Sequence, residues 1–121
     1  GAIVPSGPVR DFRHADVVTL ERTCRLAAGG SGKAQGTVCR GARLGSARLA
    51  QCDLSGADFS GARAHGARLE GSNLEGTILR KANLQSAGLI RARLVQADLR
   101  HAALPAAVLD GANLDGARLD S

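Results

Sequence analysis

Residues 42–61 read ARLGS ARLAQ CDLSG ADFSG, and the same five-residue pattern continues without a change of register to Ser121. If Thr37–Gly41 is the first unit, the central residue recurs at every fifth position from Cys39 to Leu119, which makes 17 units. The central residue is Leu in 14 of them, and the residue two places earlier is Ala in 13. A period of five matches neither the 3.6 of a helix nor the 2 of a strand. Each unit is therefore one side of a repeating coil.

The pattern also predicts which residues face inward. The large central residue and the small residue two places before it point into the core, and the other three positions face solvent or turn a corner. Pro105 stands where the chain enters a corner, a place that suits its fixed φ. Glycine ends many units, as a tight corner with positive φ requires. These glycines are Gly41, Gly56, Gly61, Gly66, Gly71, Gly76, Gly111 and Gly116.

Taken together, these units resemble the pentapeptide-repeat family, whose consensus is A(D/N)LXX, over roughly two thirds of the chain. The resemblance implies an all-β solenoid, a right-handed quadrilateral β-helix with four units in each coil. Residues 20 apart then share a column, and residues 37–121 make about four coils. The central residues Phe59 and Ala64 fall in one coil, where a large ring and a small methyl group compensate in volume.

Residues 1–36 do not repeat and form a separate N-terminal region in this interpretation. Val17, Leu20, Cys24 and Ala27 recur at helical spacing within residues 16–28, and Asp16 can serve as N-cap. The glycines of residues 29–36 predict a flexible connector. An open solenoid end exposes leucines and strand edges, so we expect the helix to cap the first coil.

Composition narrows the classes of function. The formal net charge is +5, but basic and acidic residues are mixed along the chain, which is typical of a solvated surface more than of a nucleic-acid site. No apolar run approaches a membrane span, so we expect a soluble protein of the cytoplasm, with peripheral association with a membrane complex left open.

The three cysteines allow two interpretations. Cys39 and Cys52 occupy inward positions, where thiols pack as compact apolar fillers. Alternatively, Cys24 on the buried side of the predicted helix pairs with Cys39, which leaves Cys52 as the one thiol. That disulfide would indicate an oxidising or exported compartment, such as the thylakoid lumen in which some relatives of the resembled family occur. No signal peptide is recognised, although a processed mature form would look the same.

The sequence predicts no catalytic, cofactor-binding or metal-binding residues. His65 and His101 fall at outward positions of different coils, and the carboxylates are scattered over convex faces. There is no CxxC motif and no histidine at ligand spacing. Because a filled solenoid offers no pocket where a nucleophile and a base could meet, we expect a protein that is not an enzyme.

Two outward surfaces are candidate contact sites. Arginines stack over two coils on neighbouring faces, at Arg43 above Arg63 and at Arg48 above Arg68. Apolar residues take outward positions near the C-terminal end, where scattered aliphatics need no explanation but a cluster suggests an interface. These residues are Ile78, Ile90, Val95 and Val108. We add Leu119, a central leucine of the last coil, because we expect the leucines at the uncapped end of the stack to reach water.

Members of the resembled family whose role is understood present a rigid surface to another protein. We therefore expect a non-enzymatic protein-interaction or structural module, for example an accessory subunit of a larger assembly. We expect it to contact another protein or a second copy through its C-terminal coils. One alternative is the branch that mimics a DNA duplex and binds type II topoisomerases, although that branch is acidic and this chain is basic. A basic nucleic-acid-binding solenoid is the other alternative, and it is favoured only by the charge.

Overall fold

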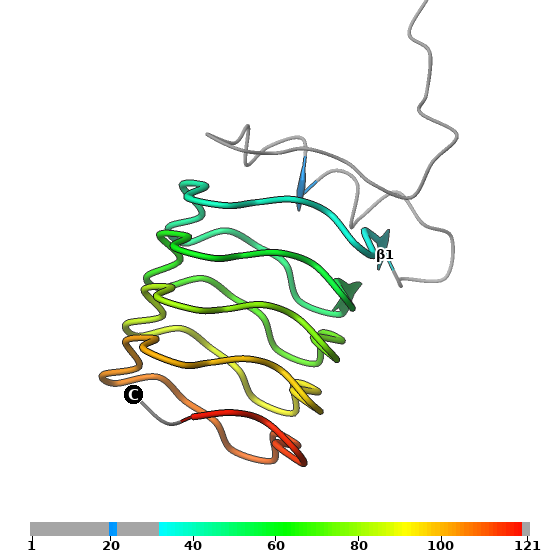
Figure 1. The fold of residues 1–121 in the computed structure, drawn as a ribbon, viewed down its shortest axis with the longest axis vertical. Coiled ribbons are helices and arrows are strands. Elements are labelled where there is room, and N and C mark those ends of the chain that lie inside the picture. Colours follow the sequence, from blue (N-terminus) through cyan, green and yellow to red (C-terminus); the bar gives the residue numbers. More distant parts are fainter. Residues whose placement is uncertain (1–19, 22–31, 120–121) are drawn as a thin grey trace, which may run out of the picture.

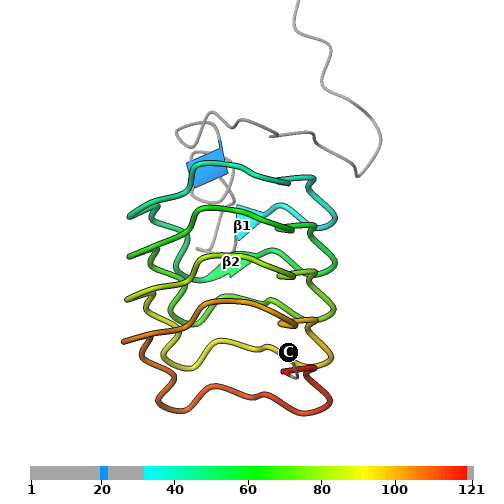
Figure 2. The ribbon, with the colours of Figure 1, turned by 60° about the vertical axis from the view of Figure 1, so that its left-hand side comes forward.

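The computed structural model describes residues 20–21 and 32–119, which form a stack of coils with a nearly constant outline (Figure 1). Two short strands pair in parallel: β1 (Gly32–Lys33) and β2 (Cys52–Asp53). Thirteen single-residue parallel bridges continue the pairing, and each joins residues 20 apart, from Val38 with Asp58 to Asp98 with Arg118. Four five-residue units therefore complete one coil, and every coil pairs with the next (Figure 2).

We number the four faces of the stack by the central residues of their units. Face 1 has centres 39, 59, 79, 99 and 119, face 2 has centres 44, 64, 84 and 104, face 3 has centres 49, 69, 89 and 109, and face 4 has centres 34, 54, 74, 94 and 114. Gly32–Gly36 belongs to face 4, because β1 pairs with β2 and the Ala34 N–H donates to the Asp53 carbonyl at 2.7 Å. Residues 32–36 are therefore a first repeat unit, and the prediction of a flexible connector there was wrong. A glycine-rich unit hid the pattern, since Ala34 replaces the central leucine.

The predicted inside and outside positions are confirmed. Central leucines and the small residues two places earlier form one continuous buried cluster through the stack. Two small polar residues at inward positions satisfy their hydroxyl groups locally: Ser72 and Thr77 donate to the carbonyls of Leu69 and Leu74 at 2.7 and 2.8 Å. A buried polar group costs little when it is hydrogen-bonded. The core therefore tolerates these exceptions to alanine.

Corners follow one geometry. After each central residue, a backbone N–H three residues later donates to its carbonyl, as Ala107 does to Leu104 at 3.1 Å. The third residue of the turn has positive φ, which is typical of a type II turn. The predicted corner glycines all adopt this conformation, with φ between 64° and 71°. Eight residues other than glycine adopt it too, among them Ala106 with φ 60°, directly after Pro105.

Aspartate and asparagine before the central residue have a structural role that the repeat pattern alone did not reveal. Their side chains accept the backbone N–H two residues later, as Asn73 does from Glu75 at 3.0 Å and Asn113 does from Asp115 at 3.0 Å. Asn83, Asp53, Asp58 and Asp98 do the same. This local bond supplies an acceptor to an N–H that no neighbouring coil reaches. Units with arginine at this position lack the bond.

Ala106 leads to a test of the corner geometry. A residue with a Cβ in the left-handed region destabilises the fold by about 1–2 kcal/mol. Glycine removes this strain, but part of the gain is offset because glycine loses more backbone entropy on folding. We expect Ala106→Gly to raise the free energy of unfolding by about 0.5–1 kcal/mol, measured in guanidinium by far-ultraviolet circular dichroism. Ala103→Gly is the matched control, because Ala103 is exposed and lies in an extended bridge with Asn83. A change in the same direction for both variants would contradict this account.

Of the capping helix predicted over residues 16–28, only Leu20 and Glu21 lie among the described residues. Both are helical, and Leu20 is fully buried in the core cluster. The Arg48 N–H donates to Glu21 Oε2 at 2.6 Å, whereas the equivalent N–H in the next coil, at Arg68, donates to the Ala47 carbonyl. The Glu21 carboxylate therefore takes the place of a backbone carbonyl at the first coil. The helix itself stays a prediction.

Candidate functional site

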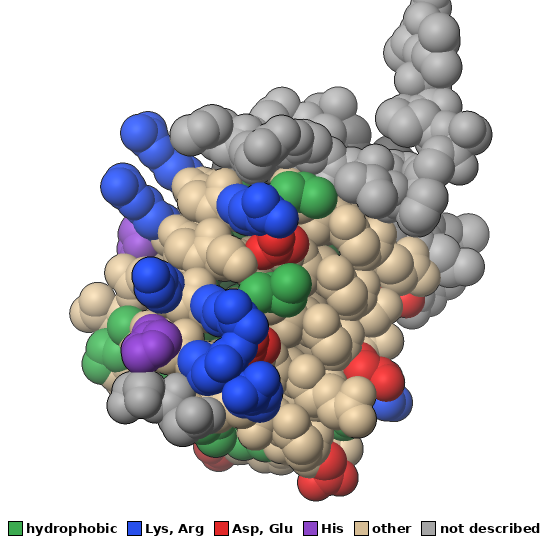
Figure 3. All heavy atoms as spheres, in the orientation of Figure 1, with side chains coloured by type: hydrophobic (Ala, Val, Ile, Leu, Met, Phe, Trp, Pro, Cys, Tyr) green, Lys and Arg blue, Asp and Glu red, His purple; other side chains and the backbone are tan. Residues whose placement is uncertain are grey.

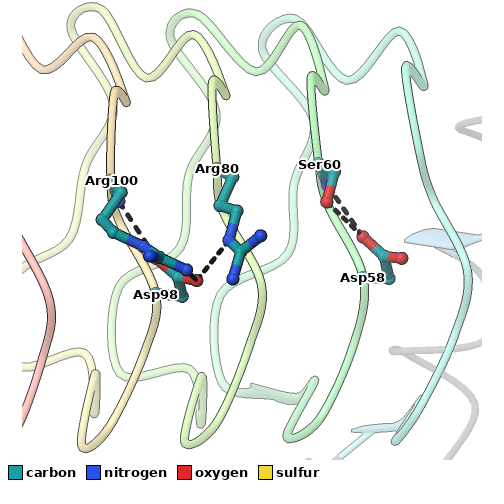
Figure 4. A network of polar contacts seen from close by, with 5 residues as sticks. All are labelled: Asp58, Ser60, Arg80, Asp98 and Arg100. Carbon is teal, nitrogen blue, oxygen red and sulfur yellow. Dashed lines mark hydrogen bonds and ion pairs between the residues drawn. The ribbon is translucent and has the colours of Figure 1, made fainter. Parts of the chain in front are cut away.

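Face 1 carries a network of aspartate and arginine side chains (Figure 4). Asp98 accepts from Arg80 Nε at 2.5 Å and is held by Arg100 through two bonds, Nε to Oδ1 at 2.9 Å and Nη2 to Oδ2 at 2.8 Å. Two coils earlier on the same face, Asp58 accepts a hydrogen bond from Arg40 Nε at 2.5 Å and another from Ser60 Oγ at 2.7 Å. The Arg40 and Arg80 bonds each join residues 18 apart, so they link successive coils.

This network lowers the pKa of both carboxyl groups. Partial burial alone would raise the pKa of Asp58, but the hydrogen bonds from Ser60 and Arg40 outweigh it and bring the pKa below its ordinary value. The hydrogen bonds from Arg100 lower the pKa of Asp98 well below its ordinary value, against the effect of burial, and Arg80 adds to the change. Both groups are therefore carboxylates at neutral pH, and they neutralise the arginines around them.

The lowered pKa values predict an acid-dependent loss of stability. A carboxyl group with a lower pKa in the folded state stabilises the fold above its unfolded pKa, and this contribution falls as the pH drops toward the folded pKa. We expect the free energy of unfolding to decrease below about pH 4, and to decrease less in Asp98→Asn, when thermal unfolding is followed between about pH 7 and 2. Asp110→Asn, on face 3, is the matched control. An identical acid loss in wild type and Asp98→Asn would contradict the prediction.

The four predicted basic-surface arginines are brought together as two stacked pairs. Arg43 bridges to Arg63 on face 2, and Arg48 bridges to Arg68 on face 3. All four are exposed, and no carboxylate of the described residues lies within ion-pair distance of them. We call these two pairs the arginine ladders. The corner between faces 2 and 3 separates them.

Charge is unevenly distributed around the stack. Among the described residues, faces 1 and 2 together with the ladder on face 3 hold nine basic residues and two acidic ones, Asp58 and Asp98. The other five carboxylates of the described coils lie on the remainder of faces 3 and 4, beside three basic residues. Figure 3 shows basic side chains gathered along one edge of the molecule. The sequence order concealed this separation, because each coil visits all four faces.

The predicted apolar contact residues do not form one patch. Ile78 lies on face 1 between its bridge partners Asp58 and Asp98, and Val95 lies on face 4. Ile90 and Val108 share face 3 and are 39% and 42% exposed. Ile90 and Val108 are 18 residues apart on one face, as Arg80 and Asp98 are, and Arg80 and Asp98 are in contact. Among the predicted apolar residues, this is therefore the pair whose positions favour a side-chain contact.

The last described coil is the most open part of the core. Leu104, Leu109 and Leu114 are partly buried, whereas the leucines of the inner coils are buried, and Leu119 is 54% exposed. This agrees with the sequence-based expectation that leucines near residue 119 reach water.

The disulfide prediction was wrong. Cys52 is disulfide-bonded, whereas Cys39 keeps a thiol that lies 3.8 Å from Thr37 Oγ1. Both sulfurs are buried in the first coils, so no sequence signal distinguished them. Cys24 lies outside the described residues. Because the central Cys39 side chain is enclosed among neighbouring units at 0% exposure, it serves as a core filler, which is the first of the two interpretations.

The cysteine assignment is tested by counting thiols. We expect one thiol for each chain under denaturing, non-reducing conditions, and peptide mapping should place it at Cys39. Because Cys52 is disulfide-bonded, we expect its peptide to be alkylated only after reduction. Alkylation of Cys52 without prior reduction would contradict this prediction.

Other kinds of site find no support in the described part of the chain. No group of three or more His, Cys, Asp or Glu residues there is arranged to hold a metal ion. The histidines His65 and His101 are exposed on different coils. No helix among the described residues is long and apolar enough to cross a membrane.

Comparison with known proteins identifies the family. The model of the pentapeptide repeats matches eight copies, over residues 37–76, 57–94 and 92–121. The chain therefore belongs to the pentapeptide-repeat family, whose members are right-handed β-helices. A search of curated proteins found no significant match.

Solved structures agree with this assignment. A pentapeptide-repeat protein from Nostoc, alr5209, is 30% identical with a TM-score of 0.65, and the match covers 94% of this chain and 79% of that one. Rfr23 from the cyanobacterium Cyanothece is 28% identical with a TM-score of 0.63, over 78% and 67% of the two chains. A protein of the Arabidopsis thylakoid lumen is 27% identical over 69% and 63%, but its TM-score of 0.45 is too low to support an argument about compartment.

Proposed function

We propose that this chain is a non-enzymatic module that binds another protein through its rigid outer surface, as an accessory subunit of a larger assembly does. The observation that carries the proposal is that inward and outward positions of each unit have separate roles. Two residues of five fill the core, and the remaining three are outward side chains held at fixed spacing by the bridges between coils. Such a surface is well suited to recognition, because little conformational entropy is lost when it binds.

The interior gives no support to catalysis. An internal gap between the central side chains of the described coils has a volume of only about 10 Å³ and is lined by Leu, Phe and Ala side chains. A substrate pocket is far larger and carries a few convergent polar groups. The ionisable groups of the described coils lie instead on the outer faces, where the polar contacts are with neighbouring side chains.

Charge argues against the DNA-mimic alternative. A protein that replaces DNA on a cationic surface needs a negative face, yet the described coils carry twelve basic and seven acidic residues, and their acidic side is mixed. The disulfide at Cys52 supports an oxidising compartment for the folded protein, since cytosolic proteins rarely keep disulfides.

The proposal is tested by chemical cross-linking in native extract, followed by purification of the tagged full chain. We expect a partner protein in constant ratio, with cross-links confined to outward positions of neighbouring faces. The double variant Ile90→Lys with Val108→Lys tests whether the apolar pair on face 3 contributes to partner binding. We expect less partner to be recovered with this variant if the C-terminal coils form the contact. Recovery of the chain alone after cross-linking, at concentrations where it is folded, would contradict the proposed function.

A further inference from the structure

The arginine ladders stack like charges, and no described carboxylate forms an ion pair with their guanidinium groups. Bridged residues of neighbouring strands lie about 5 Å apart, and like charges directly opposite each other destabilise a sheet. Arg43 and Arg63 are in this relation, and so are Arg48 and Arg68. Removal of one charge from each ladder should therefore leave the fold at least as stable as before.

On face 1, by contrast, the arginines are neutralised by aspartates of the same chain. There, Arg40 and Arg80 each reach an aspartate of the next coil, and Asp98 also binds Arg100 through two parallel bonds. The ladders have no such carboxylate among the described residues. Their guanidinium groups keep their capacity for bidentate bonds to an external carboxylate or phosphate.

Backbone donors add to this surface. Where aspartate or asparagine precedes the central residue, its side chain accepts the N–H two residues later, as Asn83 does from Gln85 at 3.0 Å. Arginine at this position cannot accept. The N–H groups of Gly45 and His65 accordingly have no acceptor among the described residues. These donors lie beside Arg43 and Arg63, at the corner that separates the two ladders.

We propose that the arginine ladders and this corner bind an acidic segment of a partner protein, one with closely spaced aspartate or glutamate carboxylates. This inference rests on the proposed interaction function and adds the chemistry of the partner. Its basis is the combination of four exposed guanidinium groups that have no counterion among the described residues and two N–H donors that have no acceptor there, all on one convex edge.

A protein segment suits the surface better than nucleic acid does. The described outward positions contain no aromatic residue on which a base could stack, since Phe59 is buried. The ladders span only two coils, and Asp58 and Glu70 lie on either side of them, where they would repel a continuous phosphate backbone. A specific DNA interface needs a larger basic area, on the order of 1,000 Å² or more.

The test uses a fluorescent peptide of alternating Glu and Ser, with anisotropy as the readout. We expect Arg43→Gln with Arg63→Gln, and Arg48→Gln with Arg68→Gln, each to weaken binding about tenfold or more, because charge-assisted bidentate bonds are lost. The control is Arg91→Gln with Arg93→Gln, which removes the same number of positive charges at the corner between faces 3 and 4, outside the ladders, and should leave affinity unchanged. Circular dichroism melts of the ladder variants should match or exceed wild type, so a loss of binding would not reflect unfolding.

Three results would overturn this inference. One is equal weakening by the control pair, which would mean that net charge alone attracts the peptide. Another is no measurable binding of the peptide to wild type at low salt. The third is tighter binding of a duplex DNA of mixed sequence, with a steep loss of affinity as salt rises. If a natural partner is recovered equally well with the ladder variants, the ladder site is wrong while the proposed interaction function stands.

Discussion

Leu74→Ala is expected to lower the free energy of unfolding by about 2–5 kcal/mol, because it leaves a cavity in the middle of the leucine core. Leu74 is fully buried, and its N–H donates to Arg93 in the next coil at 2.7 Å. The backbone bonds survive the substitution, so the loss should come from the removed side-chain atoms and the gap they leave. Guanidinium unfolding followed by circular dichroism is the suitable measurement, since the chain has no Trp or Tyr for fluorescence.

Two controls make this measurement specific. Leu119→Ala is the same chemical change at a residue that is 54% exposed, and we expect it to cost well under half as much. Glu75→Ala removes an exposed neighbour whose ion pair with Arg93 is at the surface, so its effect should stay within about 0.5 kcal/mol. Equal losses for Leu74→Ala and Glu75→Ala would show that the assignment of inward and outward positions is wrong.

Phe59 and Ala64 are expected to be strongly coupled. Both are central residues of one coil, both are nearly fully buried, and both line the same small internal gap. We expect Phe59→Leu to cost about 1–2 kcal/mol through a cavity, and Ala64→Leu to cost about 1–3 kcal/mol through overpacking. In the double variant, the space freed by the ring accommodates the larger side chain. The double variant should therefore be more stable than the sum of the two losses by about 1 kcal/mol or more.

The measurement is a double-mutant cycle under the same denaturant conditions. Phe59→Leu combined with Leu109→Ala is the control, because Leu109 lies on another face in the last complete coil, and these two effects should add within about 0.5 kcal/mol. Additivity of the Phe59 and Ala64 substitutions would show that volume compensation between the two does not operate.

Much of the fold was predictable because the repeat is short and regular. The five-residue period, the alternation of large and small apolar residues and the corner glycines each report on local geometry, and the structure confirms all three. The prediction missed the first unit, Gly32–Gly36, since its centre is Ala34 and its glycines are equally typical of a linker. Positive φ at corner residues such as Arg91 and Ala106 was also missed, because those residue types do not indicate it.

The candidate site was predictable only in part. The stacking of Arg43 on Arg63, and of Arg48 on Arg68, followed from the 20-residue coil. The pairing of Arg80 with Asp98 depends on an offset of 18 residues, which reflects how side chains lean between coils. The presence of counterions at one basic column and their absence at another therefore became visible only in three dimensions.

Sequence alone determined that this chain is a pentapeptide-repeat solenoid with a leucine core, because every unit repeats the same local requirements and the repeated unit resembles the consensus of that family. Tertiary structure decided which cysteine is bridged, that Glu21 accepts the Arg48 N–H at the first coil, and that the arginine ladders have no counterion among the described residues. These features share one physical cause. Each depends on contacts between residues that are distant in the sequence. The five-residue repeat specifies which side chains face the core, but it does not specify which neighbours the outward side chains contact.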